Sequence, residues 1–171
     1  MKAEELKALQ APLKDRYREQ PAAALVTLKA SGRLGEGITC KVDTGRALVE
    51  AGLHPATGGD GSMVCSGDML LEALAACAGV TMNAVATSLG INIRGGTVRT
   101  EGDLDFRGTL GVDKEARVGF AAIRLHFDLD TDATDEQLAT LVRLTERYCV
   151  VYQTLRQAPE ITVGHRVTSQ V

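Results

Sequence analysis

Tryptophan is absent from the chain, aromatic residues make up only 4% of it, and no block of basic residues occurs. With a net charge of −3, the composition argues against nucleic acid and anionic membrane as main partners. No charged segment followed by an apolar one stands at the start, so we expect a cytoplasmic protein. The 171 residues suffice for one domain with a substantial core, with or without an additional arm.

The sequence also lacks the patterns typical of metal and nucleotide sites. None of the four cysteines belongs to a CxxC pair, and the three histidines share no ligand spacing. No Lys-Ser/Thr follows the glycines at 58, 59 and 61, as a phosphate-binding loop would require. We therefore expect no metal and no cofactor. Taken one at a time, the cysteines at 40, 65, 77 and 149 are expected to be small buried hydrophobic residues.

The most informative stretch is residues 66–89, which we expect to form a helix that is apolar on nearly every side. Ser66 is the expected N-cap, Asp68 is favoured in the first turn by the helix dipole, and Gly90 ends the helix. Three polar residues interrupt the apolar pattern, so a core helix enclosed by other elements is expected, not a membrane span. Cys77 lies in its middle, flanked by small residues.

The remaining pattern predicts an α+β arrangement. Residues 1–20 are expected to form a helical arm, and 21–171 the domain proper. Before the central helix, we expect a hairpin made of a strand over 24–30, a turn at 31–35 and a second strand over 38–42. A short strand over 47–49 and a glycine-rich loop over 51–65 should follow. After it, we expect a strand within 91–106, a polar turn at 108–116, a strong strand at 118–129, one long helix from the Thr134 capping box to just before Pro159, and a terminal strand at 161–167.

Two cysteines lie on the two predicted long helices, Cys77 on the first and Cys149 near the end of the second. They could be two unrelated core residues. They could also be a pair that helix packing brings together and that cycles between dithiol and disulfide. Composition by itself favours the first interpretation.

Two local motifs favour the second interpretation. Residues 66–77 (SGDMLLEALAAC) resemble the P-x-E-L-L-x-x-A-L-x-x-C signature of the OsmC/Ohr family of osmotically inducible and organic hydroperoxide resistance proteins. Residues 149–155 (CVVYQTL) resemble the second motif of that family, C-P-V-x-x-x-L. The resemblance covers roughly 22–168 and is closer to the broad OsmC-like branch than to the Ohr enzymes proper.

The resemblance implies an OsmC-like α+β fold, with antiparallel sheets packed around two long helices, in an intertwined homodimer with active sites at the subunit interface. It also implies a thiol-dependent peroxidase that reduces organic hydroperoxides and is regenerated by a dihydrolipoyl or thioredoxin-like dithiol. Cys77 would be the peroxidatic thiolate and Cys149 would resolve it as an intramolecular disulfide. Arg33 would polarise the thiolate and the peroxide, and Asp68 would orient Arg33. The apolar residues expected around the thiol suit an organic peroxide; they are Leu70, Leu74, Met82 and Val85.

The chain departs from the family pattern at three positions, with Ser66 in place of Pro, Asp68 in place of Glu and Val150 in place of Pro. Helix geometry places Asp68 on the opposite side from Cys77, about two and a half turns away, so it would act only through an arginine from elsewhere. The alternatives are that Asp68 is a favourable first-turn charge and Arg33 an exposed turn residue. The alternative function is a non-catalytic dimer that binds an apolar ligand or senses redox state.

Overall fold

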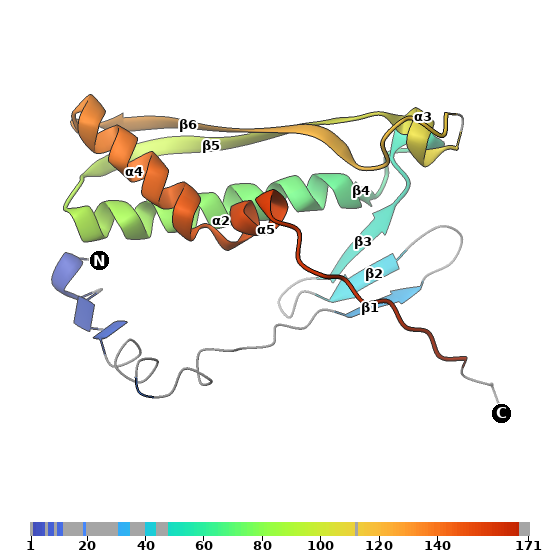
Figure 1. Cartoon of the computed structure of the whole chain (residues 1–171), viewed down its shortest axis with the longest axis horizontal. Coiled ribbons are helices and arrows are strands. Elements are labelled where there is room, and N and C mark those ends of the chain that lie inside the picture. Colours follow the sequence, from blue (N-terminus) through green and yellow to red (C-terminus); the bar gives the residue numbers. More distant parts are fainter. Residues whose placement is uncertain are drawn as a thin grey trace.

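The structure is a computed structural model that describes residues 2–5, 7, 8, 10, 11, 19, 31–34, 40–43, 48–111 and 113–167 (Figure 1). It confirms the α+β class: a long helix lies against a two-stranded ribbon, and two further helices pack beside it. These elements are α2 (Ser66–Leu89), β5 (Ile93–Leu104), β6 (Phe120–Thr131), α4 (Asp135–Tyr148) and α5 (Val150–Arg156). A short helix, α3 (Phe106–Thr109), follows β5.

Helix α2 has the length that its sequence predicts, with a correction at its start. Its N-cap is Cys65 in an extended conformation, and Ser66 is already the first helical residue, so the prediction of Ser66 as N-cap was wrong by one position. Asp68 lies in the first turn, as predicted. At the other end Gly90 has a φ of 69° and its N–H donates to the carbonyls of Ala86 and Thr87, which is the left-handed glycine ending expected from the sequence.

Strands β5 and β6 form a long antiparallel ribbon with two chemically different faces. The inner face packs on α2, and the Thr100 hydroxyl donates to the Leu71 carbonyl at 3.0 Å. The outer face carries ion pairs between the strands, such as Arg99 with Asp128 at 2.6 Å. This alternation confirms the strand predicted at 118–129, which begins and ends two residues later in the structure. Its apolar residues point inward and its charged residues point outward.

Helix α4 begins as predicted, but it does not continue to the end of the predicted helix. The Thr134 hydroxyl accepts from the Gln137 N–H at 3.3 Å and Gln137 Oε1 accepts from the Thr134 N–H at 2.9 Å, which confirms the capping box. The single long helix was wrong, because Cys149 is extended, with a ψ of 108°. The chain changes direction there, so that α4 and α5 both contact α2.

The N-terminal strands form a separate sheet, in the order β1 (Ser31–Leu34), β2 (Cys40–Asp43), β3 (Leu48–Gly52) and β4 (Val64–Cys65). Pairing is antiparallel except between β3 and β4. The predicted turn at 31–35 was therefore wrong for the described residues 31–34, which pair with β2 as a strand; Ser and Gly at 31 and 32 are compatible with extended backbone. The predicted strand over 24–30 lies outside the described residues.

Two expectations for chain segments need correction. The loop over 51–65 contains the end of β3, a 3₁₀ turn at Pro55–Thr57 and β4. The terminal strand at 161–167 was wrong: this segment has no strand, and Ile161 and Val163 are 79% and 93% exposed. A strand needs a ladder partner for its backbone groups, and none lies beside this segment in the part of the chain that the structure describes.

The core lies between α2, the inner face of the ribbon and α4–α5. Its buried hydrophobic residues form two clusters, one with Leu74, Ala78 and Cys149 and the other with Met82, Ala86 and Leu141. Helix α2 is long and apolar enough to cross a membrane by length and composition, but it packs against β5, α4 and α5 here. We expected other elements to enclose α2, but within a single chain they do not enclose it on all sides, because Val80 is 72% exposed. The cytoplasmic location and the division into 1–20 and 21–171 stay predictions.

Candidate functional site

The structure brings the two predicted redox cysteines together. Cys77, near the middle of α2, packs against the buried cluster that contains Cys149, and the two thiols affect each other's pKa. Both thiols are free, so the site is described in its reduced, dithiol form. Cys149 is only 1% exposed, whereas Cys77 is partly exposed. Of the two thiols, Cys77 is therefore the one that a small molecule can reach.

The surroundings of Cys77 favour its thiolate. Burial, the largest single effect, would raise the pKa of Cys77, but hydrogen bonds to the sulfur outweigh it and the pKa is lowered. Four groups make these bonds: the Val151 N–H, the Cys149 thiol, the Val150 N–H and the Thr81 hydroxyl. A lowered thiol pKa raises the fraction of the nucleophilic form at neutral pH.

The pKa of Cys149 is shifted in the opposite direction, upward. Burial, again the largest effect, and the neighbouring Cys77 raise the pKa of the Cys149 thiol, and hydrogen bonds from the backbone of Tyr152 and Val151 only partly offset this. Cys77 therefore loses its proton first, while Cys149 keeps its own and donates to the Cys77 sulfur. The pair has one nucleophile and one proton-bearing partner.

The local sequence creates this asymmetry through the break between α4 and α5. Because Cys149 is extended, the N–H groups of Val150 and Val151 begin a new helix and are not bonded to the carbonyls of Glu146 and Arg147. They point to the Cys77 sulfur instead. A proline at position 150, as in the family pattern, has no N–H, so Val150 gives this chain one donor more.

Sequence reasoning missed three of these donors. Thr81 lies four residues after Cys77 and so shares its side of the helix, a spacing that could have identified it. The N–H groups of Val150 and Val151 had no signal in the sequence, because one continuous helix was expected there. Their availability depends on the break at Cys149.

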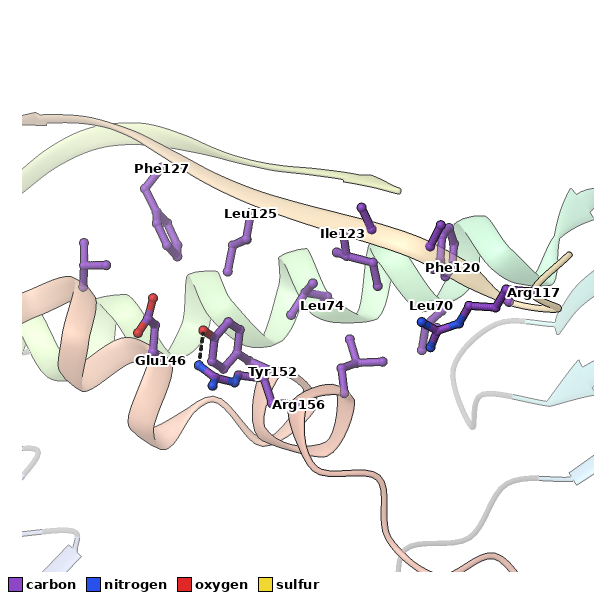
Figure 2. Close-up of a pocket in the computed structure, with 15 residues that line it drawn as sticks. Leu70, Leu74, Arg117, Phe120, Ile123, Leu125, Phe127, Glu146, Tyr152 and Arg156 are labelled. Atoms are coloured by element: carbon purple, nitrogen blue, oxygen red, sulfur yellow. Dashed lines mark hydrogen bonds between the residues drawn. The ribbon is translucent and has the colours of Figure 1, made fainter. Parts of the chain in front are cut away.

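An apolar cavity of about 740 Å³ lies beside the thiol pair, between α2, β6, α4 and α5 (Figure 2). Of the four apolar residues expected around the thiol, Leu74 packs in the cluster with Cys149 and also lines the cavity, and Leu70 lines the cavity. Met82 and Val85 belong to the second core cluster. The two thiols do not line the cavity, but Leu74 and Tyr152 belong both to its wall and to the cluster around Cys149. The cavity therefore reaches the immediate neighbours of the sulfurs. Its other apolar walls are Phe120, Ala121, Ala122, Ile123, Leu125, Phe127, Val142 and Leu155.

Four side chains with polar or charged ends also line this cavity. Glu146 and Arg156 lie with Tyr152 at the end near the thiols, and Arg156 Nη1 donates to Tyr152 Oη at 3.4 Å (Figure 2). Arg117 lies at the other end, beside Leu70 and Phe120 (Figure 2). The arrangement suits an apolar ligand with a polar group at an end.

The other two predicted site residues are not brought to the thiols by the described structure. Arg33 lies in β1, opposite Lys41 in β2, and not in a turn; its side chain is outside the described part of the chain. Asp68 is exposed and lines a different cavity of about 360 Å³, together with His54 and Cys65. Among the described residues, no group of three or more His, Cys, Asp or Glu side chains could hold a metal ion.

Comparisons with known proteins give the family and the fold. A family model described as OsmC-like protein matches residues 59–164, which include both thiols. An OsmC-like protein from Mycoplasma pneumoniae is similar in structure, with a TM-score of 0.65 and 18% identity over 78% of this chain and 89% of that one. The organic hydroperoxide resistance protein OsmC from Legionella pneumophila has a TM-score of 0.62 and 19% identity, over 78% of this chain and 92% of that one. The organic hydroperoxide resistance protein OhrB of Bacillus subtilis has a TM-score of 0.53 and 22% identity, over 79% of this chain and 94% of that one. No curated protein matches.

Proposed function

Since this chain belongs to the OsmC family, we propose that it is a thiol-dependent peroxidase that reduces organic hydroperoxides. The observation that carries the proposal is the Cys77–Cys149 pair, in which one thiol has a lowered pKa and the other a raised pKa. Two of the structurally similar proteins are named organic hydroperoxide resistance proteins, which supports the same substrate class.

The proposed reaction has two steps that use these two sulfurs. The Cys77 thiolate attacks the terminal oxygen of R–O–O–H, the O–O bond breaks, and the products are a Cys77 sulfenic acid and, after proton uptake, the alcohol R–OH. The Cys149 sulfur then attacks the Cys77 sulfur, and water leaves as the disulfide forms. Contact between the two side chains allows the second step to compete with further oxidation of Cys77.

Regeneration needs two electrons from outside the chain. We propose a dithiol of the dihydrolipoyl or thioredoxin-like kind, which becomes a disulfide as Cys77 and Cys149 return to thiols. We also propose that two copies form a homodimer and that Arg33 of one copy supplies a guanidinium to the thiolate of the other. Asp68 would act only by orienting that arginine, since it lies on the opposite side of α2 from Cys77.

The two cysteines have different roles in this scheme, so their single substitutions should fail differently. Cys77→Ser should abolish the consumption of cumene hydroperoxide. Cys149→Ser should react once, and mass spectrometry after one equivalent of peroxide should find Cys77 as sulfenic acid or as more oxidised forms. The parent protein should instead lose two hydrogens as the disulfide forms.

A second candidate function, a binding protein for an apolar ligand, is favoured by the size of the cavity. The same measurement distinguishes the two. If both serine variants consume peroxide at the rate of the parent, the chemistry does not occur at these thiols and the binding protein is the better description. If Cys149→Ser loses the first reaction while Cys77→Ser keeps it, the two roles are reversed.

A further inference from the structure

The chain on either side of Cys149 is exposed, although Cys149 itself is buried. Tyr148, the last residue of α4, is 59% exposed, and Val150, the first residue of α5, is 69% exposed. The backbone of Cys149 therefore lies directly beneath a stretch of accessible surface. A partner that has to reach the Cys77–Cys149 pair can approach it over Tyr148 and Val150.

A groove of about 520 Å³ lies on this surface, between the end of α4 and α5. Three arginines line it, Arg143 and Arg147 from α4 and Arg156 from α5. The Arg147 guanidinium lies 5.7 Å from the centre of the Tyr148 ring, and the Arg156 guanidinium lies 5.9 Å from that of Tyr152. Because arginine and tyrosine are enriched where proteins bind each other, the groove has the composition of a protein docking site.

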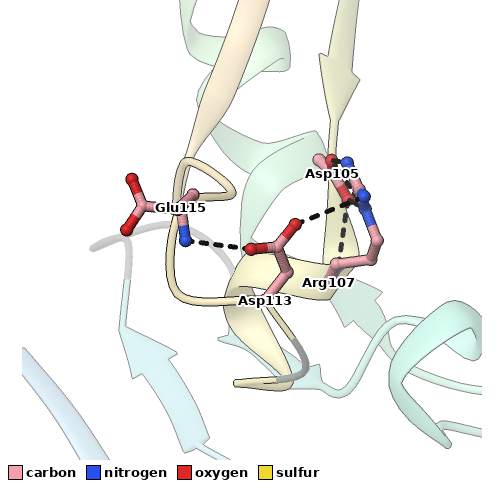
Figure 3. A network of polar contacts seen from close by, with 4 residues as sticks. All are labelled: Asp105, Arg107, Asp113 and Glu115. Carbon is pink, nitrogen blue, oxygen red and sulfur yellow. Dashed lines mark hydrogen bonds and ion pairs between the residues drawn. The ribbon is translucent and has the colours of Figure 1, made fainter.

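The α4 arginines of this groove differ in charge environment from the arginines of the ribbon and of α3. Three ribbon arginines each pair with a carboxylate on the opposite strand; they are Arg94, Arg99 and Arg124. In α3, Arg107 pairs with Asp105 at 2.6 Å and with Asp113 at 3.3 Å (Figure 3). Arg143 and Arg147, in contrast, have no ion pair with any residue in the described part of the chain.

The groove is positively charged, although the whole chain has a net charge of −3. Glu146 is the one carboxylate among the described residues that line it, and it attracts Arg156. The helix dipole favours Arg147 and Arg156, which lie in the last turns of α4 and α5, but Arg143 lies one turn earlier. Since two of the three guanidinium charges have no carboxylate of their own, an acidic surface on a partner would complement the groove.

The groove adjoins the thiol pair. Glu146, Tyr152 and Arg156 line both the groove and the apolar cavity (Figure 2). Tyr152 also packs in the cluster that contains Cys149, which is only 1% exposed. A dithiol that regenerates a disulfide at this position has to be held beside it, because few collisions would reach a buried sulfur in the right orientation.

We propose that this groove is the docking surface for the protein that supplies the reducing dithiol, and that this protein presents an acidic face to Arg143 and Arg147. The inference rests on the proposed peroxidase function and adds the surface that receives the reductant and the charge of the partner that fits it. It also identifies the two arginines that bind the partner without touching the peroxide.

The exchange that docking permits has two steps. One thiolate of the partner attacks the Cys149 sulfur, the Cys77–Cys149 bond breaks, and Cys77 leaves as a thiolate. Cys77 is the better leaving group, because its pKa is lowered whereas that of Cys149 is raised. The second thiol of the partner then attacks the mixed disulfide and releases Cys149. Two electrons and two protons pass to the pair, and the partner ends as a disulfide.

The test uses two synthetic peptides that each carry a Cys-x-x-Cys dithiol, one flanked by glutamates and the other by glutamines. Alkylation and mass spectrometry follow the return of the oxidised protein to thiols. Arg143→Gln combined with Arg147→Gln should slow reduction by the glutamate peptide about three- to tenfold, the size expected for two exposed ion pairs. Reduction by the glutamine peptide and by dithiothreitol should not change. In the parent, added salt should slow only the glutamate peptide.

Lys114→Gln combined with Arg166→Gln is the matched control. It removes the same number of exposed positive charges from positions outside the groove. This variant should be reduced by the glutamate peptide at the rate of the parent. A similar slowing in both double variants would mean that net charge, and not the groove, attracts the peptide, and would overturn the docking surface.

Two further measurements separate this inference from the proposed function. Consumption of one equivalent of cumene hydroperoxide by the reduced protein tests the peroxidase alone and should be the same in all three proteins. Fluorescence anisotropy with a labelled glutamate peptide that has serines in place of its cysteines tests the groove alone, and it should show weaker binding only when Arg143 and Arg147 are replaced. Equal reduction rates or equal peptide binding in the three proteins would overturn the docking surface. A lower light-scattering mass on replacing the two groove arginines would overturn it as well, because the groove would then be a contact between copies of the chain.

Discussion

At the scale of single residues, hydrogen-bond donors lower the pKa of Cys77 and so make it reactive. Among the described residues, none of the groups that lower this pKa carries a charge. Two of these donors are backbone N–H groups at the start of α5, and one of them belongs to Val150. The side chain of Val150 is 69% exposed, so its packing contributes little. The contribution of this residue is its N–H, which makes it separable by substitution.

Replacing Val150 with Pro should raise the pKa of Cys77, because proline cannot donate to the thiolate. Position 150 is the first residue of α5, where proline is well tolerated, so the fold should be kept. The rate of Cys77 alkylation by iodoacetamide against pH measures the change. The profile should move to higher pH, and the variant should react more slowly with peroxide below that pKa.

Val150→Ala is the matched control, since it shortens the exposed side chain and keeps the N–H. Its alkylation profile should coincide with that of the parent. If the proline variant also coincided with the parent while remaining folded, the Val150 N–H would have no part in the activation of Cys77.

At the scale of elements, the site depends on how α4 and α5 pack on α2. Leu141 of α4 is fully buried in the cluster with Met82 and Ala86, and it anchors α4 eight residues before the break at Cys149. Leu141→Ala should lower the free energy of unfolding by about 2–5 kcal/mol, the usual cost of truncating a buried leucine. Urea unfolding followed by circular dichroism measures this value.

Leu110→Ala makes the same chemical change at a side chain that is 54% exposed. It should change the free energy of unfolding by less than about 1 kcal/mol, in line with exposed positions in general. Similar losses for both variants would mean that Leu141 does not anchor α4 as the structure places it.

At the scale of the whole molecule, one chain leaves apolar surface uncovered along α2. Val80 is 72% exposed and Leu89 44%, although the helix is apolar on most sides. In Figure 1 the sheet of β1–β3 extends away from the body that α2 forms with the ribbon. Both features are consistent with the homodimer that the family resemblance implies.

Light scattering at micromolar concentration should therefore give twice the 18.1 kDa mass of one chain. Val80→Glu should shift the mass toward that of the monomer, because it places a charge on the apolar face of α2. Leu110→Glu introduces the same charge at an exposed position just after α3 and should leave the mass unchanged. A monomer mass for the parent would contradict the dimer and the proposed delivery of Arg33 from a second copy.

The sequence by itself determined the elements that have strong local signals. The ends of α2, the capping box of α4 and the alternation of β6 follow from side chains a few residues apart, and the structure confirms them apart from the one-residue shift at Ser66. The two cysteine motifs also pointed to Cys77 and Cys149 as a pair, because the family resemblance links positions that are distant in sequence.

Only the tertiary structure decided the chemical surroundings of the thiols. The break at Cys149, the N–H groups that it directs to Cys77 and the cavity with Arg117 at its end all depend on how α2, α4–α5 and β6 pack together. The prediction of a terminal strand was wrong for the same reason. Residues 161–167 have strand-like alternation, but no strand in the described structure pairs with them. Helix propensity and strand alternation are local, whereas hydrogen-bond partners and cavity walls come from segments far apart in the chain.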